Sequence, residues 1–266
     1  MFREDFVWGV ASSAYQVEGT DAADGRGACV WDMFAADGRV FEHQNADTSC
    51  DHMHHYKEDI ALMKHLGIRA YRFSLNWARI LPEGTGRVNE KAIAMYRDMI
   101  LTMKENGITP YLTLFHWEFP QALYERGGWQ NPDVVQWFGE YAKVVAENFS
   151  DICEYFITIN EPQCVVGLGH LSGVHAPGVK LPVAQTFLVA HHLLMAHGQA
   201  VINLHRYAVR PVKIGFAPTG GVAYPYTDRP EDIEAAKKVY FGFYNPIDNW
   251  TWNVSWFSDP VFLGHY

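Results

Sequence analysis

The sequence predicts an α/β fold built on a parallel β-sheet, of the (β/α)8-barrel kind. Apolar strand-like segments alternate with helix-like segments along the chain, as in a parallel sheet covered by helices. The segments after the strands are long and rich in aromatic, Pro, Gly and His residues, whereas those after the helices are short. In a barrel, the strand-to-helix loops build the active site and the opposite loops only connect the elements. This asymmetry favours a barrel enzyme over a doubly wound binding domain.

Five apolar segments are predicted to be buried strands. The third of them, ITPYLTLFHW, is nearly continuous, as expected of a strand that is buried on both faces of a parallel sheet. The five segments cover residues 6–10, 70–77, 108–117, 155–160 and 212–217. Eight units at this spacing would need roughly 410 residues, so the 266 residues correspond to about the first five βα units of a barrel.

Helix-like stretches separate these strands. Apolar residues recur at helical spacing in each stretch, and Gly67 and Gly107 are placed to end the first two helices. The predicted helices cover residues 54–66, 89–106, 132–149 and 182–207. No internal repeat or Gly/Ser linker marks a boundary, so residues 1–266 are expected to form a single domain.

Composition excludes several functional classes. The chain is 48% apolar with a net charge of −9, which argues against a disordered chain and against a nucleic-acid partner. It has no phosphate-cradling glycine motif, no signal-peptide h-region and no apolar run long enough to span a membrane. The four scattered cysteines match neither a disulfide framework nor a paired metal site. A soluble cytoplasmic protein is therefore expected.

Glu161 is the first candidate for chemistry. It ends the fourth predicted strand in the segment TINEP, and Pro162 is expected to stop the strand and to hold Glu161 in an extended conformation. Glu161 would then lie at the carboxyl rim of the sheet, where a carboxyl group partly removed from water suits a general acid. On spacing alone, a surface Glu in an ion pair is an equally good interpretation.

Other strand ends carry polar and aromatic residues. Arg72 lies in the second strand, His116 and Trp117 end the third, and Gln16 follows the first. Polar groups beside indole rings suit a carbohydrate, whose hydroxyls need hydrogen-bonding partners and whose C–H faces pack on aromatic rings. Taken singly, Arg72 is better explained by a structural ion pair and His116 by a hydrogen-bonded core histidine. Their common position at strand ends favours a sugar site.

These motifs together resemble the N-terminal part of the family 1 glycoside hydrolases, the retaining β-glucosidase family. The resemblance runs in order through the whole chain. It is carried by FVWGVASSAYQVEG at 6–19, GRGACVWDMF at 25–34, DHMHHYKEDIALMKHLGIRAYRFSLNWARILPEG at 51–84, YLTLFHWEFPQAL at 111–123, GGW at 127–129, TINEP at 158–162, HAPG at 175–178 and SDPVFLGHY at 258–266.

The resemblance assigns catalytic roles to three residues. It implies that Glu161 is the acid/base and that Asn160 bonds the 2-hydroxyl of the sugar, a contact that strengthens in the oxocarbenium-like transition state. Arg72 would lie beside a nucleophilic carboxylate and keep it ionised, since a neighbouring cation lowers the pKa of a carboxyl group. The two carboxyl groups of such a retaining enzyme lie about 5–5.5 Å apart.

The resemblance also implies how the sugar is bound. Gln16 and His116 would hold the hydroxyls at the far side of the glycone ring, and Trp117 would line that subsite. Tyr15 stands where the 6-phospho-β-glycosidase branch usually has Asn, so oligosaccharides or aryl and alkyl glucosides are the expected substrates. Glu118 replaces the commoner Asp of an HWD motif, with no obvious catalytic cost.

No cofactor is implied. His52, His54 and His55 include a His-x-His pattern that can bind zinc. The family has a similar segment at the start of a helix without a catalytic metal, so no metal ion is expected. Cys164 lies close to Glu161 in the sequence, where a modified thiol would interfere with the site.

The nucleophile is missing from the sequence. The family carries it in an Ile/Val-Thr-Glu-Asn-Gly segment on a later strand, and this chain has no such segment. Two functions remain open at this point. In the first, the chain is one part of a β-glucosidase and inactive alone, and the remaining βα units come from a second polypeptide or have been lost by cleavage. In the second, it is a non-catalytic sugar-binding or assembly subunit. In either case a complementing chain or self-association is expected to cover the open edges of the sheet. A 6-phospho-β-glycosidase is a less favoured variant of the first.

Overall fold

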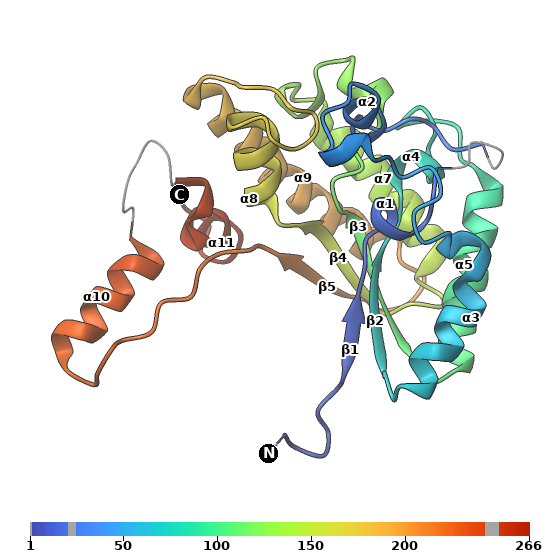
Figure 1. The fold of residues 1–266 in the computed structure, drawn as a ribbon, viewed down its shortest axis with the longest axis horizontal. Coiled ribbons are helices and arrows are strands. Elements are labelled where there is room, and N and C mark those ends of the chain that lie inside the picture. The colour runs from blue at the N-terminus through green and yellow to red at the C-terminus, as the bar shows by residue number, and fades with distance from the viewer. Residues whose placement is uncertain (1, 21–24, 243–249) are drawn as a thin grey trace.

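The computed structural model describes residues 2–20, 25–242 and 250–266, and its centre is a parallel sheet (Figure 1). The sheet has five strands in the order β1-β2-β3-β4-β5, so each strand pairs with its neighbour in the sequence. This order and direction confirm the predicted (β/α) arrangement. The strands are β1 (Gly9–Ala11), β2 (Ala70–Ser74), β3 (Thr109–Phe115), β4 (Tyr155–Asn160) and β5 (Lys213–Ala217).

Helices connect the strands and cover the outer side of the sheet (Figure 1). The longer ones begin and end within a few residues of the predicted bounds, and α5 starts where the Asn89 side chain accepts the N–H of Ala92. The α-helices are α1 (Ala14–Val17), α2 (Val30–Ala36), α3 (His52–His65), α4 (Trp77–Ile80), α5 (Glu90–Glu105), α6 (Gln121–Tyr124), α7 (Val134–Phe149), α8 (Pro162–Cys164), α9 (Val183–Tyr207), α10 (Pro230–Phe241) and α11 (Val254–Phe262). A π-helical segment, Val165–Leu171, follows α8, and short 3-10 turns cover Phe41–His43, Gly128–Gln130 and Trp250–Trp252.

The core lies between the sheet and these helices and supports the ends of β2 and β3. Trp77 is fully buried at its centre, with its indole stacked on the Tyr141 ring at 5.1 Å between centroids. The rings of Phe115, Phe119 and Phe138 surround the same indole. Aromatic packing of this density fixes the backbone from which the last residues of β3 project.

Two strands end earlier than predicted, because a capped helical turn follows β2 and a left-handed residue, Trp117, follows β3. The strand expected over residues 70–77 stops at Ser74, since Asn76 caps α4 and its side chain accepts the N–H of Arg79. The strand expected over residues 108–117 stops at Phe115, so His116 and Trp117 belong to the loop after β3. The second correction places His116 and Trp117 just beyond the end of β3, whereas Arg72 lies within β2.

The first strand was predicted incorrectly as a buried segment over residues 6–10. In the structure β1 starts at Gly9, and its three residues are exposed. Before it, the rings of Phe2, Phe6 and Trp8 pack on one another, but each remains 41% or more exposed. The apolar run is buried neither by a strand nor by a helix of the described part of the chain, because β1 pairs only with β2 there.

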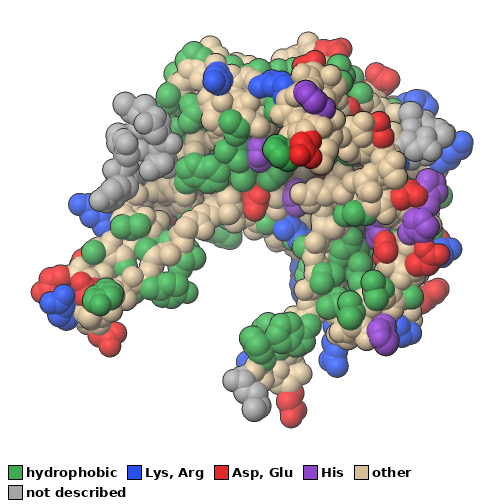
Figure 2. All heavy atoms as spheres, in the orientation of Figure 1, with side chains coloured by type: hydrophobic (Ala, Val, Ile, Leu, Met, Phe, Trp, Pro, Cys, Tyr) green, Lys and Arg blue, Asp and Glu red, His purple; other side chains and the backbone are tan. Residues whose placement is uncertain are grey.

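The sheet is open within the described ranges, since β1 and β5 each pair on one side only. Figure 2 shows the molecule hollowed between the N-terminal segment and α10, with apolar side chains on both sides of the hollow. The N-terminal segment and the stretch from β5 to α10 carry exposed apolar residues, among them Val7, Val10, Val222, Val239 and Phe241. Among the helices that the structure describes, none is both long and apolar enough to cross a membrane.

Candidate functional site

The carboxyl ends of β2, β3 and β4 are joined by a chain of side-chain hydrogen bonds. Arg72 of β2 donates from Nε to Thr113 Oγ1 at 2.9 Å and from Nη2 to Asn160 Oδ1 at 2.5 Å. Asn160 Nδ2 lies 3.0 Å from Nε2 of His116. Three residues that the sequence placed at separate strand ends are therefore in direct contact. The chain of bonds fixes the orientation of the Asn160 amide, which is 3% exposed.

His116 is held neutral in this arrangement. Burial, with the nearby Arg72 guanidinium, lowers the pKa of His116 to about 3. Because Asn160 Nδ2 can only donate, Nε2 of His116 accepts and the ring proton is assigned to Nδ1. A neutral imidazole that is held by Asn160 on one nitrogen suits hydroxyl recognition rather than proton transfer.

Glu161 follows β4 and lies half-buried at the edge of this cluster. Its backbone is left-handed, with φ +43° and ψ +66°, so the predicted extended conformation is wrong. The fourth strand, β4, does end at Asn160, shortly before Pro162, as predicted. The reason for the left-handed turn is that Glu161 N–H donates to Ala217 O of β5 at 2.7 Å, while its carbonyl accepts the N–H of Cys164 at 3.0 Å and begins α8.

A second site residue, Trp117, also has a left-handed backbone, with φ +86°. Its Nε1 donates to Asn160 O at 3.1 Å, and its carbonyl accepts the N–H of Phe119 at 2.8 Å. Left-handed conformations are unfavourable for residues with a Cβ and cluster at functional sites, where surrounding contacts hold them. Trp117 and Glu161 thus show local backbone strain on either side of Asn160.

A cavity of about 360 Å³ opens in front of these residues. Gln16, His116 and Trp117 line it together, and Gln16 is exposed to it from α1. Ser13, Tyr15, Trp31 and His175 line it as well. Residues of the loop between α2 and α3 form a further part of the wall, and sequence reasoning missed them because this stretch has neither periodicity nor a motif. They are Val40, Gln44, Asn45, Ala46 and Ser49.

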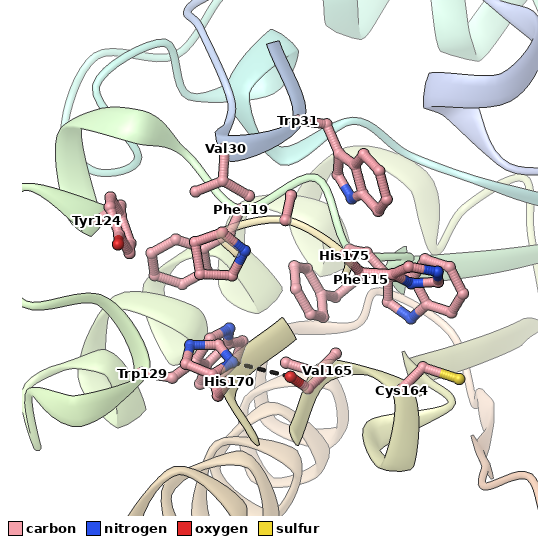
Figure 3. Close-up of a pocket in the computed structure, with 13 residues that line it drawn as sticks. Val30, Trp31, Phe115, Phe119, Tyr124, Trp129, Cys164, Val165, His170 and His175 are labelled. Atoms are coloured by element: carbon pink, nitrogen blue, oxygen red, sulfur yellow. Dashed lines mark hydrogen bonds between the residues drawn. The ribbon is translucent and has the colours of Figure 1, made fainter. Parts of the chain in front are cut away.

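Aromatic rings form the rim between this cavity and a narrow apolar pocket beside it (Figure 3). His175 lies between Trp31 and Trp117, at 5.4 and 5.6 Å between ring centroids. Cys164 lines the narrow pocket and its Sγ lies 3.5 Å from Glu161 Oε2, so the predicted closeness of this thiol to the carboxylate is confirmed. Burial is the main cause that raises the pKa of the Cys164 thiol to about 12, which keeps it protonated and a hydrogen-bond donor.

A buried network anchors the segment that carries Gln16. Arg79 Nε donates to Glu18 Oε2 at 3.2 Å and its Nη2 donates to Gly19 O at 2.9 Å. Tyr96 Oη donates to the second oxygen of Glu18 at 2.8 Å. The side chains of Glu18 and Arg79 are 3% and 2% exposed. Glu18 is therefore structural, and it holds the turn after α1 against α4 and α5.

Arg72 has no carboxylate partner in the described residues, since its hydrogen bonds run to Thr113 and Asn160 and no ion pair includes it. Glu161 is near enough to act on it electrostatically, and burial lowers the pKa of the guanidinium. His52, His54 and His55, the three histidines near the start of α3, each contact an acidic neighbour, which is Asp59, Asp51 and Glu58 respectively. Within the described ranges, no group of three or more His, Cys, Asp or Glu side chains is spaced to hold a metal ion.

The sequence matches a known protein family and several of its members. The family model described as glycosyl hydrolase family 1 matches residues 1–266. The chain is 43% identical over 266 residues to β-glucosidase A of Thermotoga maritima, covering 100% of this chain and 57% of that protein. It is 41% identical over 273 residues to β-glucosidase 42 of Arabidopsis thaliana, covering 100% of this chain and 53% of the relative.

Solved structures of β-glucosidases also superpose on this chain. The family 1 β-glucosidase from Thermotoga maritima superposes with a TM-score of 0.87 at 42% identity, over 100% of this chain and 57% of the other. The complex of that organism's β-glucosidase with deoxynojirimycin gives a TM-score of 0.88, with 58% of its chain covered. The chain therefore spans rather more than half the length of these relatives, and it matches their N-terminal portion.

Proposed function

The chain belongs to glycosyl hydrolase family 1, and we propose that it forms the part of a retaining β-glucosidase that carries the general acid/base. The observation that supports this most is the position of Glu161. Glu161 follows the carboxyl end of β4 and directly succeeds Asn160, whose amide is held by Arg72 and His116. Residues 1–266 would act as a single domain built on one sheet.

In the proposed reaction, Glu161 donates a proton to the glycosidic oxygen as the bond to the aglycone breaks. As a carboxylate it then takes a proton from the water that releases the sugar. Asn160 Nδ2 carries two hydrogens, so it would donate one to the 2-hydroxyl while the other stays on His116. Its Oδ1 would remain on Arg72, so the amide could turn no further.

Gln16, His116 and Trp117 would bind the glycone in the 360 Å³ cavity that they line. The amide of Gln16 and the neutral imidazole of His116 each combine a donor and an acceptor, as paired sugar hydroxyls require. The Trp117 indole would pack on the C–H face of the ring. Oligosaccharides and aryl or alkyl β-glucosides are the proposed substrates, and Tyr15 on the same wall argues against a 6-phosphate group.

The nucleophile would come from outside the described residues. A retaining enzyme needs a second carboxylate about 5–5.5 Å from the first, and Arg72 contacts none within the described ranges. The free sides of β1 and β5 would pair with further strands that close the barrel and bring this carboxylate beside Arg72. A complementing chain would supply these strands and the carboxylate, and residues 1–266 alone would not turn over β-glucosides. Self-association could cover the open sheet edges, but a second copy carries no nucleophile segment.

The test is hydrolysis of an aryl β-glucoside by the 266-residue chain alone, after sedimentation analysis, and together with any polypeptide that co-purifies with it. We expect negligible turnover by the chain alone and turnover by the completed assembly. Glu161→Gln should strongly reduce this turnover when the leaving group of the substrate needs protonation. Glu154→Gln is the matched control, because Glu154 lies at the opposite end of β4 in an exposed ion pair with Lys213. Turnover by a monodisperse monomer would refute the need for completion. Sugar binding without hydrolysis by any assembly would favour a non-catalytic binding subunit.

A further inference from the structure

A buried carboxyl group outside the sugar cavity links two walls of the site. Glu118 follows His116 and Trp117 in the loop after β3, and it is 1% exposed. Its Oε1 accepts the backbone N–H of Tyr15 at 2.7 Å, across 103 positions in the sequence. Since Tyr15 and Gln16 belong to α1, the bond joins the segment after β1 to the segment after β3.

The helix that receives this bond, α1, is held in place only by contacts from other segments. It has only four residues, Ala14–Val17, and the side chain at its N-cap makes no capping bond. Helices this short are unstable without outside contacts. Its first free N–H groups are satisfied from other strand ends instead: Ala14 N–H donates to Ser74 Oγ and Tyr15 N–H to Glu118 Oε1, both at 2.7 Å. Two side chains from outside α1 thus cap its N-terminus.

Glu118 is also tied to the opposite wall of the cavity. It directly follows Trp117, which has a left-handed backbone and donates from its indole to Asn160 O. One peptide therefore separates the ring that lines the cavity from the carboxyl group that holds α1. A displacement of the Glu118 side chain would change the distance between Gln16 and Trp117, which line the cavity from its two sides.

The bond to Tyr15 can form whether or not Glu118 is charged. Burial raises the pKa of Glu118 to about 8, and the N–H of Tyr15 opposes this rise. The other oxygen, Oε2, is buried and has no hydrogen-bond partner among the described residues. A carbonyl oxygen accepts an N–H in the acid, the carboxylate and the amide alike. Gln can therefore replace Glu118 at this bond, whereas an apolar side chain cannot.

We propose that Glu118 is a positioning residue, which fixes α1 against the Trp117 loop and thereby sets the place of Gln16 in the glycone cavity. This role rests on the proposed function, because it assumes that Gln16 and Trp117 bind sugar. Glu118 touches neither the sugar nor Glu161 in this role. Its loss should therefore weaken binding of the glycone more than it slows the chemical step.

The experiment compares Glu118→Met, Glu118→Gln and Ser74→Ala in the assembly that hydrolyses β-glucosides. Ser150→Ala is the matched control, because Ser150 Oγ accepts the backbone N–H of Val209 at a buried site beyond the opposite end of the sheet. Three quantities are measured for each variant: Kd for deoxynojirimycin, KM and kcat for an aryl β-glucoside, and amide hydrogen exchange of residues 14–17. Exchange in α5 and α7 reports whether each variant is folded.

Loss of one buried hydrogen bond that positions a binding group should raise Kd and KM about tenfold. We expect this in Glu118→Met and Ser74→Ala, with faster exchange at residues 14–17 and little change in kcat, while Glu118→Gln and Ser150→Ala bind like the wild type. Unchanged Kd in a folded Glu118→Met or Ser74→Ala protein would overturn the positioning role alone, as would failure of Gln to restore binding. A wild-type protein that binds no deoxynojirimycin would overturn the proposed function itself.

Discussion

Replacement of Arg79 by Met tests how much its ion pair with Glu18, in the buried network under α1, contributes to stability. Arg79 and Glu18 form an ion pair of 3.2 Å in which both side chains are nearly inaccessible, and Tyr96 donates to the same carboxylate. Met keeps most of the side-chain volume but removes the charge and the donors to Glu18 Oε2 and Gly19 O. The substitution therefore leaves a buried carboxylate without its cation.

The expected cost is about 3–5 kcal/mol of unfolding free energy at pH 7, the range for removing one partner of a buried ion pair. Removing both charges should cost much less, so Arg79→Met with Glu18→Gln is expected to recover more than half of the loss. Burial already raises the pKa of Glu18. Without Arg79 the group should take up a proton on folding, so the cost should shrink by up to about 1.4 kcal/mol for each pH unit below 7.

Urea unfolding followed by tryptophan fluorescence measures these differences at pH 7 and pH 5.5. Lys57→Met is the matched control, because Lys57 forms an exposed ion pair with Asp98 that should contribute little. A loss below about 1 kcal/mol in Arg79→Met would refute the assignment of a buried, mutually dependent pair. A double variant no more stable than the single one would refute the pairing itself.

Three further predictions concern acid stability, the core and the thiol. Burial lowers the pKa of His116 to about 3 and those of His170 and His197 to about 4, so below pH 6.5 the unfolded chain binds protons that the folded chain does not. Stability should therefore fall as the pH drops from 6.5 towards 4, and a urea midpoint that stays constant between pH 6.5 and 4.5 would contradict this. Trp77→Ala removes the ring at the centre of the aromatic core and should cost about 3–5 kcal/mol of unfolding free energy. Phe41→Ala, at an exposed position, should cost well under 1 kcal/mol. Equal urea midpoints for the two variants would contradict this prediction. A methylthio group on Cys164, 3.5 Å from Glu161 Oε2, should inhibit the hydrolytic assembly, and Cys164→Ala should abolish that inhibition while the exposed Cys50→Ala should not. Inhibition that persists in Cys164→Ala would place the sensitive thiol elsewhere.

Much of the fold could be predicted because strand and helix periodicities are local. The bounds of β4 agree with the prediction residue for residue, since the apolar run is bounded by Pro162 on one side. The first strand was misjudged because an apolar run predicts burial only when another element covers it. In the described part of the chain nothing pairs with the free side of β1, so Phe6 and Trp8 stay exposed.

The candidate site could be predicted as a set of residues but not as a geometry. Arg72, His116 and Asn160 were expected near one another because parallel strands end at the same edge. That Asn160 would bridge the other two follows from side-chain reach, which the sequence does not specify. The left-handed turn at Glu161 depends on the carbonyl of Ala217, which lies 56 positions later and was not foreseeable from the Glu-Pro pair. The caps that Ser74 and Glu118 provide to α1 are long-range for the same reason.

The most direct test of the central claim is the dependence of the Glu161→Gln variant on the leaving group of its substrate. If Glu161 protonates the departing oxygen, the hydrolytic assembly with Glu161→Gln should lose about 10²–10⁴-fold in kcat/KM for an alkyl β-glucoside or a disaccharide. An aryl glucoside whose phenolate leaves without protonation should lose far less in the same parameter. Equal losses on both substrates, or a rate near that of the wild type on the alkyl glucoside, would contradict the assignment of Glu161 as the acid/base.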